Sequence, residues 1–186
     1  VFLGKLASRL LVVAVGVAFT ATAATAVAAA KHGVVLPGLA VGVLALSLAY
    51  AAGFVSIALS LSAAFATRGR AVTGAIGSYF VLVLLFVVPG VRITGIVRWL
   101  HTTLLGFDAN VDLYNAVTFA SPYVAYRKAT NLLLPSERQA AVFRRPADAG
   151  ELPAYLGDEV ALVVLAAWIV VPLVLGYRRF DRADLL

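Results

Sequence analysis

The chain contains no cysteine, which excludes a disulfide framework and a thiolate metal site. It has two histidines, and no carboxylates stand at ligand spacing from them, so no zinc site is predicted. The phosphate-binding pattern G-x-x-x-x-G-K-[ST] is missing, and residues 74–78 (GAIGS) do not make the G-x-S-x-G of a serine hydrolase. We therefore expect no catalytic site, cofactor or metal in this chain.

Charged residues are also scarce, at 13% of the chain. None lies in the middle of a long apolar run, where ion-coupled carriers, proton pumps and voltage sensors normally need one. The chain is therefore not expected to energise transport by itself. Methionine is missing too, and residue 1 is valine, so we expect the sequence to be a fragment of a longer protein.

Hydrophobic residues, in contrast, make up 62% of the chain, against about 45 to 50% in an ordinary soluble domain. Several runs approach or exceed the roughly 20 residues that cross the bilayer as a helix. We predict an all-α, polytopic membrane helix bundle that forms a single transmembrane domain over residues 1–186. Its four predicted spans are residues 6–30, 37–65, 71–89 and 156–177, with an outer segment at 90–155.

A secretory signal peptide is an alternative for the first run, since it also has a basic start and an apolar centre. The run from Leu10 to Ala30 is long for such a peptide, and Val1 is not an initiator. A membrane span is the favoured interpretation.

A basic turn inside residues 53–80 sets the predicted orientation. Arg68 and Arg70 join two apolar segments with no acidic residue between Gly53 and Phe80. Arginine is costly in hydrocarbon and collects in short cytoplasmic loops, so we expect this turn and the C-terminus in the cytoplasm of a multi-pass cell-membrane protein. The net charge of +6 is spread over the ends of apolar runs rather than one polar face, so no nucleic-acid partner is expected.

Small residues recur about every four positions along the predicted spans. This spacing lets helices approach closely in lipid, where the hydrophobic effect gives no help. The predicted helix-packing residues are Ala14, Ala18, Gly38, Gly42, Ala49, Gly53, Ser56, Ser60, Gly74 and Ser78. Two interpretations stay open for serines such as Ser56 and Ser60: they line a transport pathway, or they bond to a carbonyl one turn back.

The outer segment has the pattern of short interfacial or re-entrant helices. Ile93, Ile96 and Leu100 share one helical face, and Trp99 suits the headgroup zone, so this piece is expected to lie along the membrane surface. Ser121-Pro122 is a typical helix start and predicts a helix to Leu134. Pro172 is expected to kink the last span.

Several short motifs, in this order and spacing, resemble the C-terminal two thirds of a type-2 ATP-binding cassette (ABC) permease subunit. They are also similar to the branch of permeases for nitrous oxide reductase maturation. The motifs are Gly4-Lys5-Leu6, the hairpin from Phe54-Val55-Ser56-Ile57 to Thr67-Arg68-Gly69-Arg70, Ser121-Pro122 with Ala125-Tyr126, Trp168 to Pro172, Gly176 to Phe180, and Arg182 to Leu185.

The resemblance implies a non-catalytic permease subunit that a separate cytoplasmic ATPase drives. This subunit would work with a second permease subunit, identical or paralogous. Two permeases would tilt between inward- and outward-facing packings. The expected contacts to the ATPase are Thr67, Arg68, Gly69, Arg70, Arg178, Arg179 and Arg182. The family's main coupling helix would lie ahead of Gly4-Lys5, outside this sequence. The alternatives are a non-transporting membrane scaffold or assembly factor, and an ion-coupled carrier or channel.

Overall fold

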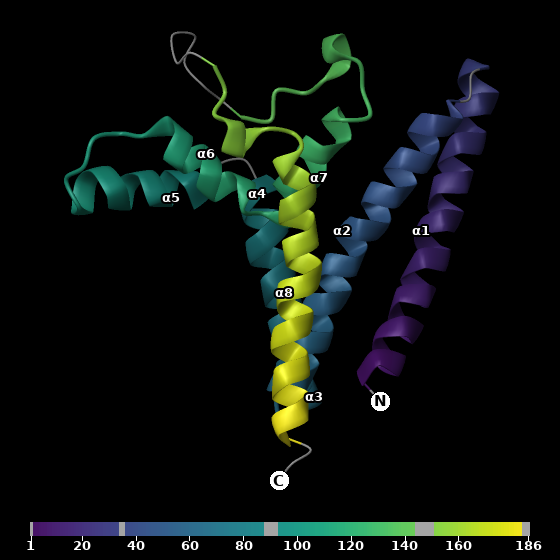
Figure 1. The fold of residues 1–186 in the computed structure, drawn as a ribbon, viewed down its shortest axis with the longest axis horizontal. Coiled ribbons are helices and arrows are strands. Elements are labelled where there is room, and N and C mark those ends of the chain that lie inside the picture. Colours follow the sequence, from purple (N-terminus) through teal and green to yellow (C-terminus); the bar gives the residue numbers. More distant parts are fainter. Residues whose placement is uncertain (1, 34–35, 88–92, 144–150, 184–186) are drawn as a thin grey trace. The chain divides into compact units, whose positions relative to one another are not determined.

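The computed structural model describes residues 2–33, 36–87, 93–143 and 151–183. Every regular element in these ranges is a helix, which confirms the predicted all-α class (Figure 1). The chain divides into two compact units. The first unit contains Val1–Ala75 and Ala166–Leu186, and the second unit contains Ile76–Leu165.

The first unit is built on two long antiparallel helices, α1 (Phe2–His32) and α2 (Pro37–Ala64), which pack side by side (Figure 1). Gly33, with φ of 67°, lies in the left-handed region that ends a helix, and Pro37 opens α2 at the position where proline is favoured. The unit also holds the start of α3 (Arg68–Tyr79) and most of α8 (Val160–Ala183), which continues through Pro172.

Three helices in the described residues are long and apolar enough to cross a membrane: Leu3–His32, Pro37–Ala64 and Val160–Asp181. They match the first, second and last predicted spans. The predicted span 71–89 is not among them, so the count of four spans is not confirmed. Its described residues form α3, a π-helical turn (Phe80–Leu84) and α4 (Leu85–Val87), while Pro89 and Gly90 lie outside the described residues.

The second unit is a set of short helices. They are α5 (Ile93–Trp99), a π-helical turn (Leu100–Leu104), α6 (Val111–Phe119), α7 (Pro122–Asn131) and 3-10 turns at Ser136–Arg138 and Ala154–Leu156. Asn110 caps α6 by accepting a hydrogen bond of 2.9 Å from the backbone N–H of Leu113.

Two predictions for this segment are corrected in detail. Ser121 does stand before α7, but its hydroxyl donates to the carbonyl of Leu82 at 2.6 Å instead of capping the helix. The helix ends at Asn131 rather than Leu134, before the predicted stop at Pro135. In α5 and the π-helical turn after it, Ile93 is half-buried while Ile96 and Leu100 are exposed, and the predicted place of this piece along the membrane surface stays a prediction.

Candidate functional sites

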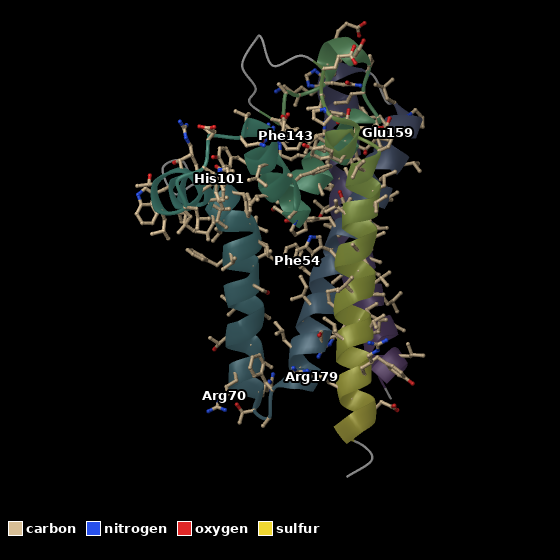
Figure 2. All side chains as sticks on the ribbon, turned by 60° about the vertical axis from the view of Figure 1, so that its left-hand side comes forward. Phe54, Arg70, His101, Phe143, Glu159 and Arg179 are labelled. Atoms are coloured by element: carbon tan, nitrogen blue, oxygen red, sulfur yellow. The ribbon has the colours of Figure 1, made fainter. Side chains whose placement is uncertain are left out.

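Basic side chains gather at one end of the first unit. Arg70, near the start of α3, and Arg179, near the end of α8, lie at the same end in Figure 2. Thr67 caps α3 by accepting a hydrogen bond of 3.5 Å from the backbone N–H of Arg70. These two predicted contacts therefore lie at the same end of the unit, although about 100 residues separate them in sequence. Arg182 lies within α8, and its side chain is outside the described residues.

At this end of the unit an open pocket of about 440 Å³ joins α1, α2 and α3. Two arginines line it: Arg9 comes from α1 and Arg68 from α3. Its remaining lining residues are Ala58, Ser62, Phe65, Ala66, Thr67, Ala71, Val72 and Ala75. The pocket thus combines two cations with an apolar wall. The sequence does not reveal that Arg9 and Arg68 line one pocket, because this depends on how the helices face one another.

Two glycines lie where α2 and α8 face each other. A Cβ atom built on Gly176 would stand 2.7 Å from the Cα of Ser60 in α2. Further along, a Cβ on Gly53 would meet the Cβ of Trp168 in α8 at 3.5 Å. Gly53 and Ser60 are predicted packing residues, whereas Gly176 was not selected. A glycine one turn after Pro172 in an apolar run is the signal that points to it.

The other predicted packing residues fall into three groups. Ala14 and Ala18 are half-buried on α1, while Gly42 and Ala49 are half-buried on α2. No described atom lies within 4 Å of a Cβ built on Gly38.

The third group contains residues that are closely packed or whose side chain forms a hydrogen bond within its own helix. The ring of Phe65 comes to 3.0 Å from a Cβ built on Gly74. Ser56 is buried, and its hydroxyl donates to the carbonyl of Ala52 at 2.8 Å, as expected for a serine that bonds one turn back. Ser78 is half-buried in the second unit.

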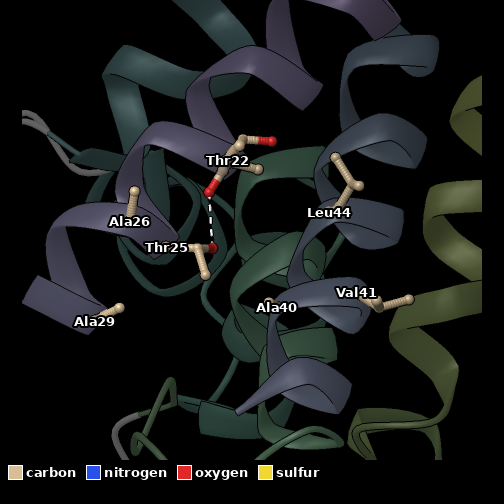
Figure 3. Close-up of a pocket in the computed structure, with 8 residues that line it drawn as sticks. Thr22, Thr25, Ala26, Ala29, Ala40, Val41 and Leu44 are labelled. Atoms are coloured by element: carbon tan, nitrogen blue, oxygen red, sulfur yellow. Dashed lines mark hydrogen bonds between the residues drawn. The ribbon is translucent and has the colours of Figure 1, made fainter. Parts of the chain in front are cut away.

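A second hollow, of about 380 Å³, lies between α1 and α2 (Figure 3). Most residues that line this hollow are small. The hydroxyls of its two threonines donate hydrogen bonds within their own helix. Thr22 donates to the carbonyl of Ala18 and Thr25 to that of Ala21, each at 2.8 Å. The hollow therefore presents an apolar surface without a free hydroxyl proton.

In the second unit, the ion pair between Lys128 and Asp158 ties α7 to the residues just before α8. Lys128 Nζ lies 2.5 Å from Asp158 Oδ1, and the two side chains are 7% and 21% exposed. The ammonium group also stands 5.1 Å from the centre of the Phe143 ring, labelled in Figure 2. At the end of α7, the side chain of Asn131 exchanges hydrogen bonds of 3.2 and 3.0 Å with the backbone of Ala140.

The sequence alone did not single out this cluster, because Lys128 and Asp158 look like ordinary outer charges when counted one at a time. A neighbouring contact joins α6 to the preceding π-helical turn: His101 Nδ1 lies 3.0 Å from the hydroxyl of Tyr114. The ring of Phe107 stacks on the same histidine at 5.3 Å between centres. These contacts join α6 to the π-helical turn within the second unit.

Three long apolar helices and a set of short helices define this chain as a multi-pass membrane protein of the α-helical class. Its family is shown by a match to the family described as ABC-2 family transporter protein, over residues 1–185. The chain belongs to this family, and it is a permease, the membrane component of an ABC transporter, which in this family is normally non-catalytic. The match does not support the nitrous oxide reductase maturation branch in particular. No curated protein and no solved structure matches the chain.

Proposed function

We propose that this permease moves its substrate when a separate cytoplasmic ATPase drives it, with a second permease subunit, identical or paralogous, completing the pathway. Family membership supports the ATPase as the class of partner. The observation that carries the proposal is the gathering of basic residues at one end of the first unit, where Arg70 of α3 and Arg179 of α8 lie (Figure 2). These cations offer an exposed surface to an acidic partner.

In this proposal the chain crosses the membrane four times as a single transmembrane domain, and both the α2–α3 turn and the C-terminus face the cytoplasm. Residues 68–87 are helical throughout, which at 1.5 Å per residue gives about 30 Å, enough for a third crossing. An even number of crossings returns the start of α1 and the end of α8 to one side. Tilting of two such subunits between two packings would alternate access to the substrate.

The ATPase contact is tested by reversing charges at the basic end. We expect R70E combined with R178E and R179E to lower ATP turnover of the reconstituted transporter by roughly tenfold or more, because glutamates that face an acidic partner repel it. Turnover and co-purification of the ATPase are measured together. The single variant R70E is compared with R138E, one reversal on the exposed 3-10 turn of the second unit, as the control for charge reversal itself. Unchanged turnover in an intact complex of the triple variant would contradict the contact.

The orientation is tested by cysteine labelling, for which the cysteine-free chain is already suited. Gly69→Cys places a thiol on the α2–α3 turn, where a Cβ meets nothing within 4 Å. Ser136→Cys places one on the exposed turn of the second unit. We expect a membrane-impermeant maleimide added outside intact cells to label Ser136→Cys alone, with Gly69→Cys reacting only after permeabilisation. The reverse pattern would overturn the proposed orientation.

A further inference from the structure

The pocket between α1, α2 and α3 holds two cations without a counter-charge. The sequence has no Asp or Glu before Asp108, so α1, α2 and α3 contain no acidic residue. Among the described residues neither Arg9 nor Arg68 forms an ion pair, and both are exposed. Two arginines that line one pocket carry like charges, so an anion supplied from outside the chain would stabilise the arrangement.

The hydroxyl groups of the pocket add a polar contact for such an anion. Thr67 already accepts a hydrogen bond from the backbone N–H of Arg70, in its role as cap of α3. Ser62 is exposed, and its hydroxyl has no hydrogen-bond partner among the described residues. Arginine presents a planar fork of donors that matches the oxygens of a phosphate group. Arg9, Arg68 and Ser62 together therefore form a set of donors suited to a phosphate.

The other half of the pocket is apolar, and this half favours an anion that carries an apolar part. Alanines, Phe65 and Val72 form a wall beside the two arginines. A soluble phosphate or an acidic peptide leaves such a wall exposed to water, whereas a phospholipid covers it with its glycerol and acyl carbons. Burying that carbon surface is favourable at roughly 25 cal/mol per Å².

The pocket also lies where phospholipid headgroups are found. Both α1 and α2 are long and apolar enough to span the membrane, and the pocket is at the end of α2, next to the α2–α3 turn. Arg9 stands two turns inside α1, from where a long side chain reaches the surface while its stem covers apolar neighbours. Basic pockets between membrane helices at this depth bind anionic headgroups.

We propose that this pocket binds one anionic phospholipid, with its phosphate held by Arg9 and Arg68 and its apolar part against Phe65 and Val72. Arg68 is also one of the expected ATPase contacts, so the two proposals are tested apart. The ATPase test reverses Arg70, Arg178 and Arg179 and leaves both pocket arginines in place, whereas lipid binding is measured on the permease without the ATPase.

The test measures lipid binding to the purified full-length permease by native mass spectrometry. Phosphatidylglycerol is titrated against phosphatidylcholine for the wild type and for R9Q, R68Q and R70Q. Arg70 is the matched control, because it carries the same charge two residues from Arg68 and does not line the pocket. We expect R9Q and R68Q each to weaken phosphatidylglycerol binding by about fivefold and R70Q to change it by less than about twofold.

Three outcomes would overturn the proposal. Equal losses in all three variants would show diffuse attraction of lipid to a basic surface. If the wild type binds phosphatidylglycerol no more tightly than phosphatidylcholine, the pocket does not recognise an anionic headgroup. Displacement of phosphatidylglycerol by millimolar inorganic phosphate would make free phosphate the ligand. R9K and R68K keep the charge and the length of the stem, so recovery of binding in them separates loss of the cation from a folding defect.

Discussion

Replacing Gly176 by leucine is expected to force α2 and α8 apart and to destabilise the first unit by about 3 kcal/mol. Even a single Cβ at this position would stand 2.7 Å from the Cα of Ser60 and 3.1 Å from its Cβ. The obstructing atoms belong to the backbone and the base of a side chain, so they cannot swing away. Unfolding of the detergent-solubilised protein by increasing sodium dodecyl sulfate measures the loss.

Gly16 of α1 is the matched control for this substitution. It too lies inside a long apolar helix, but a Cβ built on it meets no atom within 4 Å. G16L is expected to leave the stability nearly unchanged or to raise it by up to about 1 kcal/mol, since glycine is a poor helix former. If G176L and G16L shift the unfolding transition equally, the close approach at Ser60 is not what holds the two helices together.

Removing the ammonium group of Lys128 is expected to have a similarly large effect in the second unit. K128M removes the cation from the carboxylate of Asp158, which among the described residues keeps only the 3.5 Å hydrogen bond from the Asn131 amide, and takes the cation away from the Phe143 ring. Breaking one side of a buried ion pair costs roughly 3 to 5 kcal/mol, and the 21% exposure of Asp158 places the expected loss near the lower figure, about 3 kcal/mol. The same denaturation experiment measures it.

Two further variants separate the ion pair from a general effect of charge. R127M removes the neighbouring cation of α7, which is exposed, and is expected to change the stability by less than about 0.5 kcal/mol. The double variant K128M/D158N removes both charges and is expected to recover part of the loss, giving a coupling of roughly 1 to 3 kcal/mol. Strictly additive losses would mean that the two residues do not act as a pair.

The predicted third span shows where sequence and structure part within one segment. Thr73, Ser78 and two glycines lower the hydropathy of its first half, and a π-helical turn at Phe80–Leu84 divides its described residues into three elements. An apolar run can be seen in the sequence, but a change of hydrogen-bonding pattern inside it cannot. The crossing itself therefore stays a prediction for cysteine labelling to decide.

The amino-acid sequence alone determined that this protein is helical, that it belongs in a membrane and where three of its long helices lie. Those properties follow from hydropathy, charge and helix punctuation, which are local along the chain. Tertiary structure decided that Gly176 is the glycine at which the backbone of another helix comes close. It also decided that Lys128 pairs with Asp158 and that Arg9 and Arg68 line one pocket. These outcomes depend on the rotation of each helix about its axis, and small residues on nearly every face of an apolar helix leave that rotation undetermined until the helices pack.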